Sequence, residues 1–420
     1  MIGPKWTGAA EQADVCRVFH MWTLVHIGST LAWTRAIAPL QLAVVDGPHQ
    51  KPRREIPMKA SLATEVGGKF TTHDIQIDDP RGREVLVDVK ASGLCHSDLH
   101  LIDHDYGMPL PAVGGHEISG VVRSVASGVT SMKVGDHVVA CLIPFCGACA
   151  ECLAGHSTLC LNPAAVSRGE DESPRISFAD GSAIAQSVNV GGFAEQVLVH
   201  ENQLAVVNNE IPFPQAALLG CSVVTGAGAA INTAHIRPGD TVAVVGTGGI
   251  GLNAISGARL CGAKNVIAVD IVDSKLEAAK KFGATDVINS AETDAVAAIQ
   301  ELTGGVDHAF EVIGISATQR QVQEMTRPGG TAYLIGIAPP GATTSFDSSL
   351  ADLFAQRSLQ AVLMGSTNVK RDIALYADMY VQGRFELDGL VTREISLSEI
   401  NEGYEMLKKG EVIRSIITSF

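Results

Sequence analysis

Short apolar runs separated by glycine and proline occupy the chain from Met58 to about residue 240. Glu84–Val89 and Gly120–Val122 alternate or run apolar over a few positions, and Met58–Ala60 opens a similar segment. Such runs between turn residues are typical of β-strands. The pattern therefore predicts a strand-rich domain in this part of the chain.

The pattern changes near residue 241. Thr241–Val245 is a continuous apolar run, followed by a glycine turn and helical spacing over Ile250–Leu260. A second apolar run, Val266–Val269, precedes helical spacing over Ser274–Phe282. Strands that alternate with helices predict a parallel, doubly wound sheet. We therefore expect an α/β protein in which a strand-rich domain is joined to a Rossmann domain.

The length of 420 residues also favours two domains, because it exceeds the usual size of one. We expect the strand-rich domain to comprise residues 58–222 and 364–420, since the sequence from about Met364 returns to mixed structure. Residues 223–363 would then form the Rossmann domain.

The first 57 residues differ from the rest in composition. All three tryptophans lie before Met58, and polar residues interrupt the apolar stretch Val18–Trp33. This stretch is too short and too broken for a membrane span. Ala36–Ala38 resembles a cleavage site for export, but Arg35 beside it argues against that interpretation. We expect a poorly ordered extension, or a translation start at Met58 itself.

The formal net charge of −14 bears on the choice of partners. A field of this sign repels phosphate backbones, so we expect no nucleic-acid partner. Four of the nine cysteines fall within fifteen residues, which favours metal binding over a disulfide framework. We therefore expect a reducing compartment, the cytoplasm, and no membrane partner.

The pattern G-x-G-x-x-G is present at Gly246-Thr247-Gly248-Gly249-Ile250-Gly251, after a buried strand and at the start of a helix. Gly246 would make the tight turn, Gly248 would let backbone approach a pyrophosphate, and Gly251 would permit close helix–strand packing. Free N–H groups at the helix N-terminus would bind the diphosphate. Asp270, nineteen residues after Gly251, would bind both adenine-ribose hydroxyls and repel a 2′-phosphate. The cofactor predicted by this arrangement is NAD.

A four-cysteine lobe follows the pattern Cys146-x2-Cys149-x2-Cys152-x7-Cys160. Four thiolates can close a tetrahedral shell and leave no position for water or substrate. The spacing therefore predicts a structural zinc rather than a catalytic one.

Together these motifs resemble the zinc-containing alcohol dehydrogenases of the medium-chain dehydrogenase/reductase superfamily. The resemblance runs from about Met58 to Phe420 and implies a GroES-like catalytic domain joined to a Rossmann coenzyme domain. Besides the four-cysteine lobe, the matching segments are Gly93-Leu94-Cys95-His96-Ser97-Asp98, Gly115-His116-Glu117, Leu219-Gly220-Cys221, Gly246–Gly251, Glu311-Val312-Ile313-Gly314 and Gly410-Glu411-Val412-Ile413-Arg414-Ser415.

The resemblance implies a second, catalytic zinc held by Cys95, His116 and Cys221. Two thiolates and one imidazole leave a fourth position open, although spacing alone does not select these three residues. The resemblance also implies that Asp98 hydrogen-bonds His116 and fixes its tautomer. Glu117 would lie just behind the metal.

The implied reaction is the reversible oxidation of a primary or secondary alcohol to an aldehyde or ketone, with hydride transfer to NAD. Zinc would stabilise the alkoxide and lower the pKa of the alcohol toward neutral. Ser97 would hydrogen-bond the alcohol oxygen and pass its proton, through the nicotinamide ribose, to His100. Histidine suits this relay because it titrates near physiological pH.

Cofactor contacts outside the glycine turn are implied as well. His96 stands where many relatives carry arginine for the pyrophosphate, so cofactor affinity or release is expected to differ. The other implied contacts are Thr225 and Ile335 against the nicotinamide, Lys275 near the adenine ribose and Arg414 at the pyrophosphate.

The substrate pocket is expected in the cleft between the domains. Candidates for its walls are Tyr106, Pro144, Phe145 and Ile337, each of which could equally belong to the core.

Four other functions remain open on the sequence. A dehydrogenase of thiol–formaldehyde adducts would need cations in the pocket, and no clear cluster is visible. A polyol dehydrogenase would usually carry glutamate in place of Cys221. An inactive cofactor-binding protein would lack the ligand set, and a zinc-dependent nucleic-acid binder would need a basic stripe.

The assembly predicted by the resemblance is a homodimer, with a tetramer as the alternative. The long segment between Cys160 and Gly191 resembles the longer, often dimeric branch. The alcohol itself and the physiological direction are not determined by the sequence.

Overall fold

The computed structural model describes residues 57–105, 107–346 and 350–420. The predicted N-terminal extension therefore lies outside the described residues except for Pro57, and so does Tyr106, one of the candidate pocket walls.

Five strands close a small barrel in the order β1-β2-β7-β8-β4. Four of its five strand contacts are antiparallel, and β8 runs parallel to β4. Its strands are β1 (Met58–Ala63), β2 (Thr71–Ile77), β4 (Ala112–Val113), β7 (Ile176–Ser177) and β8 (Ala183–Gln186).

A seven-stranded sheet lies beside the barrel, in the order β10-β6-β5-β3-β18-β17, with β9 also paired to β3. Its C-terminal strand β18 pairs antiparallel with β3, where Ile416 lies opposite Gly93. The last strand of the chain therefore completes a sheet begun by the first hundred residues. The strands are β3 (Glu84–Gly93), β5 (Glu117–Val125), β6 (His137–Ala140), β9 (Gln196–His200), β10 (Leu204–Val206), β17 (Val391–Ser396) and β18 (Arg414–Ser419).

A six-stranded sheet, with all neighbours parallel, follows the order β13-β12-β11-β14-β15-β16. Its first strand in the chain, β11, coincides with the predicted run Thr241–Val245, and β12 contains the predicted run Val266–Val269. The strands are β11 (Thr241–Val245), β12 (Asn265–Asp270), β13 (Asp286–Asn289), β14 (Val306–Glu311), β15 (Thr326–Leu334) and β16 (Ser358–Ala361).

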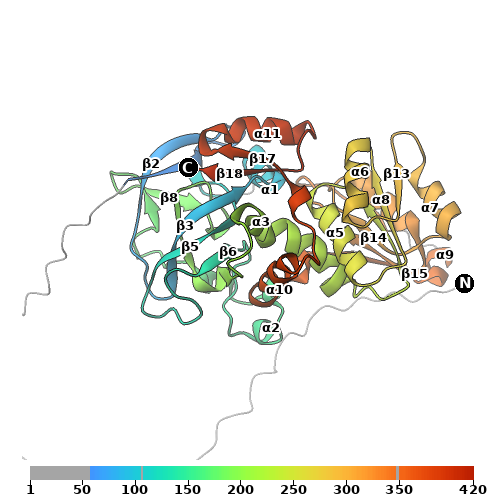
Figure 1. The fold of residues 1–420 in the computed structure, drawn as a ribbon, viewed down its shortest axis with the longest axis horizontal. Helices are drawn as coiled ribbons and strands as arrows, with labels where there is room; N and C mark the ends of the chain where they lie inside the picture. Colours follow the sequence, from blue (N-terminus) through green and yellow to red (C-terminus); the bar gives the residue numbers. More distant parts are fainter. Residues whose placement is uncertain (1–56, 106, 347–349) are drawn as a thin grey trace, which may run out of the picture. The chain divides into compact units, whose positions relative to one another are not determined.

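Helices cover both faces of this parallel sheet (Figure 1). Val242 and Val244 of β11 belong to one core cluster with residues of α5 and α6. Ala243 and Val245 point to the opposite face and pack with residues of α7 and α8. Buried strands covered on both faces define the doubly wound class, as predicted. The helices are α5 (Gly249–Leu260), α6 (Asp273–Phe282), α7 (Ala295–Thr303) and α8 (Ser316–Met325).

A continuous helical run, Phe213–Thr233, joins the two parts of the fold. It consists of α3 (Phe213–Leu218), η5 (Leu219–Val223), α4 (Val224–Gly228) and η6 (Ala229–Thr233). Among the described residues it is the one helix long and apolar enough to cross a membrane, but 83% of its most apolar window is buried in the protein. It is therefore a core helix, and the predicted boundary between residues 222 and 223 falls inside it.

Two further helices, α1 (His96–Asp103) and α11 (Ile400–Lys408), matter for the site. Helix α1 begins directly after β3, and α11 lies between β17 and β18, close to α1 at the top of Figure 1. The remaining described helices and turns are α2 (Ala150–Leu153), η1 (Ser157–Leu159), η2 (Pro163–Val166), η3 (Ser187–Asn189), η4 (Glu201–Gln203), α9 (Leu350–Ala355), η7 (Met364–Ser366), α10 (Val369–Val381), η8 (Asp388–Leu390) and η9 (Leu397–Glu399).

Candidate active site and metal centres

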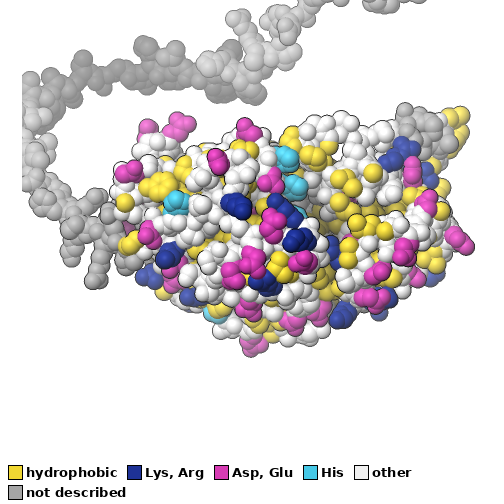
Figure 2. All heavy atoms as spheres, turned by 90° about the horizontal axis from the view of Figure 1, so that it is seen from above, with side chains coloured by type: hydrophobic (Ala, Val, Ile, Leu, Met, Phe, Trp, Pro, Cys, Tyr) yellow, Lys and Arg dark blue, Asp and Glu magenta, His cyan; other side chains and the backbone are white. Residues whose placement is uncertain are grey.

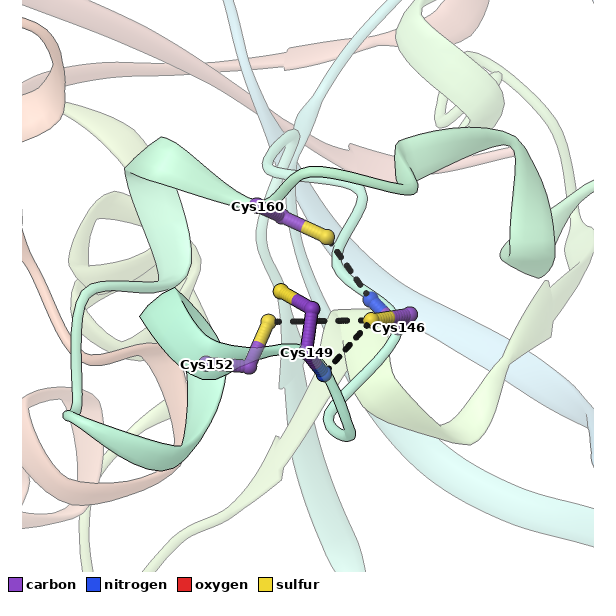
Figure 3. A group of neighbouring side chains, drawn as sticks. All are labelled: Cys146, Cys149, Cys152 and Cys160. Carbon is purple, nitrogen blue, oxygen red and sulfur yellow. Dashed lines mark hydrogen bonds between the residues drawn. The ribbon is translucent and has the colours of Figure 1, made fainter. Parts of the chain in front are cut away.

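The four cysteines of the predicted lobe converge on one point (Figure 3). Their Sγ atoms all lie within 4.8 Å of one another, and Cys146 Sγ is 3.9 Å from Cys152 Sγ. A tight turn at Gly147, with φ of 76°, brings Cys149 back toward Cys146. This donor set and spacing fit a tetrahedral Cys₄ zinc site.

Backbone N–H groups prepare these sulfurs for metal binding. The N–H groups of Ala148 and Cys149 donate to Cys146 Sγ at 3.4 and 3.3 Å, and that of Leu161 donates to Cys149 Sγ at 3.5 Å. Hydrogen bonds from Ala148 and Leu161 lower the pKa values of Cys146 and Cys149, the latter to about 6. Since the thiolate is the metal ligand, these two sulfurs are prepared for a cation. Burial instead raises the pKa of Cys152 to about 12, so a metal must displace the proton of that thiol.

A second group of metal-binding side chains is buried at the centre of the fold. It comprises Cys95, His116, Glu117 and Cys221, whose ligand atoms lie within 4.8 Å of one another. Cys95 follows the end of β3, His116 precedes β5, and Cys221 comes from the helical turn η5. Three segments distant in sequence thus meet at one site.

His116 is held in one orientation by Asp98. The Nδ1 atom lies 3.0 Å from Asp98 Oδ1, and Nε2 lies 3.3 Å from Cys221 Sγ. Because Asp98 is an acceptor, we assign the proton to Nδ1, which leaves Nε2 free to bind a metal. Burial opposes protonation, yet Asp98 and Cys95 hold the pKa of His116 well above its usual value. A metal at Nε2 must displace that extra proton.

Glu117 and Arg414 form a buried pair beside the metal-binding group. Arg414 Nε lies 3.6 Å from Glu117 Oε2, and the two side chains are 5% and 0% exposed. Burial raises the pKa of Glu117 to about 7 although Arg414 opposes this. Neither carboxylate oxygen has a hydrogen-bond partner, so Glu117 can approach a metal in this group.

The two predicted relay residues lie on α1. Ser97 Oγ is 3.5 Å from Cys95 Sγ, which places the hydroxyl beside the metal-binding group. His100 is half-buried, and its ring stacks on that of His104, with 6.3 Å between ring centroids. The helix therefore leads from the buried sulfur toward the surface.

The glycine turn has the geometry that its sequence predicts. Gly246 adopts a φ of 101°, a conformation that favours glycine. A Cβ on Gly251 would collide with the carbonyl oxygen of Gly246, whereas one on Gly248 would meet nothing within 4 Å. A Cβ on Gly249 would lie 2.5 Å from Arg414 Cζ. The Arg414 guanidinium thus lies at the N-terminus of α5, between the turn and Glu117.

The other predicted cofactor residues lie around the same region. Asp270 ends β12 and accepts hydrogen bonds from Thr247. Lys275 Nζ lies close to Gly410, 3.4 Å from the position of a Cβ there. The remaining three differ in exposure: His96 is exposed, whereas Thr225 and Ile335 are buried.

The residues predicted to line the substrate pocket do not line one common cavity in the structure. A cavity of about 810 Å³ contains Ile335 and Ile337, but neither Pro144, Phe145 nor any of the metal-binding residues. Phe145 is 7% exposed and belongs to the core. Of the described candidates, Ile337 is the one that lines this cavity.

Two residues of the site carry no obvious sequence signal. Thr247 fills a variable position of the glycine turn, yet its hydroxyl binds Asp270 at 2.9 Å. Tyr404 is 2% exposed in α11, and electrostatic interaction with Asp98 and Cys95 adds to burial in raising the pKa of its hydroxyl. An apolar face of a helix would predict only that Tyr404 belongs to the core. That its hydroxyl lies near Asp98 is known only from the structure.

Comparison with known proteins gives matches to two family models. The model described as "Alcohol dehydrogenase GroES-like domain" matches residues 81–209. The model described as "Zinc-binding dehydrogenase" matches residues 249–379. The first match covers β3 to β10 of the strand-rich part, and the second covers β12 to β16 of the parallel sheet.

Individual relatives match over nearly their whole length. An "NDMA-dependent alcohol dehydrogenase" of Amycolatopsis methanolica is 39% identical over 364 residues, covering 86% of this chain and 98% of the relative. An "S-(hydroxymethyl)glutathione dehydrogenase" of Paracoccus denitrificans is 35% identical, covering 86% and 99%. The crystal structure of benzyl alcohol dehydrogenase from Acinetobacter calcoaceticus superposes with a TM-score of 0.80 at 34% identity, covering 87% and 100%.

The chain belongs to the zinc-containing alcohol dehydrogenase family of the medium-chain dehydrogenase/reductase superfamily. It is a zinc-binding oxidoreductase that acts on alcohols. The family and the fold class predicted from the sequence are confirmed.

Proposed function

We propose that this protein oxidises a primary or secondary alcohol to an aldehyde or ketone and transfers the hydride to NAD. The observation that carries the proposal is the buried convergence of Cys95, His116 and Cys221, with Asp98 bound to the far nitrogen of the imidazole. We assign a catalytic zinc to these three ligands. The four-cysteine lobe would hold a structural zinc.

The donor chemistry fits these two roles. Two thiolates and one imidazole leave one position of a tetrahedral ion open, whereas four thiolates leave none. Zinc bound at the first site supplies a Lewis acid that lowers the pKa of an alcohol. Glu117 reaches the same group of ligand atoms, so its carboxylate would be available as a further ligand of a metal held there.

The residues of this chain orient the site and move the proton. Asp98 fixes the ring of His116, so that Nε2 faces Cys221. Ser97, beside Cys95, would accept a hydrogen bond from the alcohol hydroxyl and take up its proton. His100, five residues after Cys95 on α1 and half-buried, would release that proton to solvent.

The cofactor assignment depends on the glycine turn and its surroundings. The open space at Gly248 and the N-terminus of α5 form a site for a pyrophosphate. Arg414 lies against Gly249 and adds a positive charge there. Asp270 at the end of β12 favours the unphosphorylated ribose, hence NAD over NADP.

Metal content and activity of Cys221→Ala test the proposal. We expect two zinc ions per chain in the wild type and one in the variant, with a loss of activity of at least about 100-fold on an alcohol panel with NAD. Cys261→Ala is a matched control, because this half-buried cysteine belongs to neither metal group. A Cys221→Ala variant with wild-type zinc and activity would overturn the catalytic assignment.

A second candidate concerns the fate of the reduced cofactor. The relative from Amycolatopsis methanolica is named as NDMA-dependent. If the reduced nicotinamide stayed bound to the protein after each turnover, an added electron acceptor would be needed to reoxidise it in place. Denaturing the purified protein and assaying for released nicotinamide separates the two cases. Stoichiometric release, with activity only when an electron acceptor is added, would favour the retained cofactor.

A third candidate is oxidation of a thiol–formaldehyde adduct, as in the name of the relative from Paracoccus denitrificans. An alcohol panel that includes S-(hydroxymethyl)glutathione distinguishes it. A kcat/KM for this adduct at least about tenfold above that for simple alcohols would favour this candidate.

We also propose a homodimer in the reducing environment of the cytoplasm. The eight cysteines of the described residues form no disulfide. Leu353, Phe354 and Leu363, next to the edge strand β16, are 71%, 78% and 62% exposed, and exposed apolar side chains of this kind mark interaction surfaces. Light scattering coupled to size-exclusion chromatography tests this against the monomer and the tetramer.

We propose that this protein has no nucleic-acid partner. On the face shown in Figure 2, lysine and arginine side chains are mixed with aspartate and glutamate. Mixed signs cancel over a Debye length, so this face offers no stripe of positive charge.

A further inference from the structure

Two polar atoms remain without hydrogen-bond partners in the interior behind His116. Asp98 Oδ1 accepts from the N–H of Gly115 at 3.0 Å and pairs with His116 Nδ1 at 3.0 Å. The other oxygen, Asp98 Oδ2, has no partner, and neither has the hydroxyl of Tyr404. Asp98 and Tyr404 are only 1% and 2% exposed. Buried polar groups of this kind cost free energy unless they are paired.

The two groups complement each other chemically. Asp98 Oδ2 can only accept while the carboxylate is ionised, and the Tyr404 hydroxyl can donate. Burial, followed by the negative charges of Asp98 and Cys95, raises the pKa of Tyr404 well above its usual value. The phenol therefore keeps its proton over the working pH range.

Aromatic packing fixes the ring of Tyr404 close to the metal-binding loop. The ring stacks on Phe70, with 5.7 Å between centroids, and meets Phe193 edge-on at 6.4 Å. A Cβ on Gly115 would collide with the Phe193 ring, so this cluster packs directly against the residue before His116. The hydroxyl thus has little freedom to find another partner.

We propose that Tyr404 is a positioning residue for the catalytic metal site, donating its hydroxyl hydrogen bond to Asp98 Oδ2 and thereby fixing the carboxylate that orients His116. The inference rests on the proposed function, because it gives the imidazole the role of a metal ligand. It also connects α11, near the C-terminus, to a ligand in the first part of the chain. Partners one step removed from a metal ligand alter metal affinity through its orientation and basicity.

The variant Tyr404→Phe removes the hydroxyl and keeps the ring. The protein would be prepared with cobalt(II) at the catalytic site, where thiolate ligands give visible absorption bands, and the decay of these bands would be followed after adding EDTA. We expect cobalt loss about tenfold faster than in the wild type, with shifted bands and a fall in kcat/KM. Tyr333→Phe is the matched control, a buried tyrosine that bonds His308 in the parallel sheet.

A double-mutant cycle separates positioning from general loosening of the fold. If Tyr404 acts through Asp98, Tyr404→Phe should change cobalt loss less than about twofold in an Asp98→Asn background. Equal effects in both backgrounds would overturn the inference, and so would a Tyr404→Phe protein with the wild-type spectrum and rate of cobalt loss.

The same experiment distinguishes this inference from the proposed function. Cobalt bands that survive Cys221→Ala would overturn both, because the metal would then lie elsewhere. Bands that disappear in Cys221→Ala but stay unchanged in Tyr404→Phe would refute only the role of Tyr404.

Discussion

Asp270 accepts two hydrogen bonds from Thr247, one from its backbone N–H at 2.8 Å and one from its hydroxyl at 2.9 Å. The other carboxylate oxygen accepts from the N–H groups of Ile271 and Val272. The acidic residue that ends β12 is therefore bound to the glycine turn before any cofactor arrives. Its orientation is fixed by the protein itself, which is the preorganisation that selective binding of a ribose requires.

Replacing Asp270 should change the choice between NAD and NADP. Asp270→Asn removes the negative charge that repels a 2′-phosphate, so the ratio of kcat/KM for NAD to that for NADP should fall at least about tenfold. Steady-state kinetics with both cofactors measures this ratio. Asp273→Asn, on α6, is the control and should leave the ratio unchanged. An unaltered ratio in Asp270→Asn would refute the assigned role.

Two glycines of the same turn should respond differently to alanine. Gly251→Ala introduces a Cβ against the carbonyl oxygen of Gly246, and such overpacking costs about 2 kcal/mol of folding free energy. Gly248→Ala meets no protein atom within 4 Å and should leave the Tm unchanged. If the pyrophosphate approaches at Gly248, that variant should nevertheless bind NAD at least about tenfold more weakly.

Thermal unfolding and calorimetric titration with NAD check this pair of variants. Equal NAD affinity in Gly248→Ala and the wild type would place the cofactor elsewhere. An unchanged Tm in Gly251→Ala would show that the turn accommodates the added Cβ without a loss of folding free energy.

The four-cysteine lobe should contribute to stability rather than to chemistry. Cys160→Ser removes one thiolate, so zinc content should fall by one ion per chain and the Tm by several degrees, about 5 °C or more. The lobe is tied to α10 by the amide of Asn368, which donates to the carbonyl of Gly155 at 3.2 Å. Without zinc the lobe loses its internal cross-link, so limited proteolysis of Cys160→Ser should cut near the lobe first. Cys261→Ser should match the wild type in zinc content, Tm and proteolysis.

Glu201 predicts a dependence of stability on acid pH. It is fully buried and accepts hydrogen bonds from Ser131 Oγ at 2.5 Å and Arg83 Nε at 2.6 Å. Burial raises the pKa of Glu201, but these donors outweigh it and hold the pKa at about 2, below the usual 4.5. A lowered pKa in the folded state gives stability that is fully present above pH 4.5. It is lost as the pH falls toward about 2.

The variant Glu201→Gln should consequently lose about 2 kcal/mol near neutral pH. Its difference from the wild type should shrink as the pH falls from about 4.5 toward about 2. Urea unfolding at a series of pH values checks this. Glu277→Gln, an exposed carboxyl paired with Lys280, should stay close to the wild type throughout, and a difference that grows on acidification would contradict the argument.

Much of the fold was predictable from local sequence. The run Thr241–Val245 is a strand with the predicted bounds, and Asp270 ends the next strand as predicted. Glycine at Gly246 and Gly251 was readable because a positive φ and a close backbone approach allow no other residue. Cysteine spacing indicated the lobe of Cys146, since its ligands lie on one short loop.

The catalytic group was not readable from local pattern. Cys95, His116 and Cys221 lie on three separate segments, and an isolated histidine or cysteine in an apolar surrounding is more often a core residue. Their selection came from resemblance to a family, and their convergence within 4.8 Å is a property of the packed fold.

The sequence by itself therefore determined strands β11 and β12, helices α5 and α6, the glycine turn and the cysteine lobe, because short-range periodicity and spacing encode them. Tertiary structure alone decided that Arg414 pairs with Glu117 and that Tyr404 faces the interior near Asp98. The first contact depends on β18 pairing with β3 in the seven-stranded sheet, and the second depends on α11 packing Tyr404 against Phe70 and Phe193. Long-range packing of this kind leaves no periodic trace in the chain, so these contacts become visible only when the fold is complete.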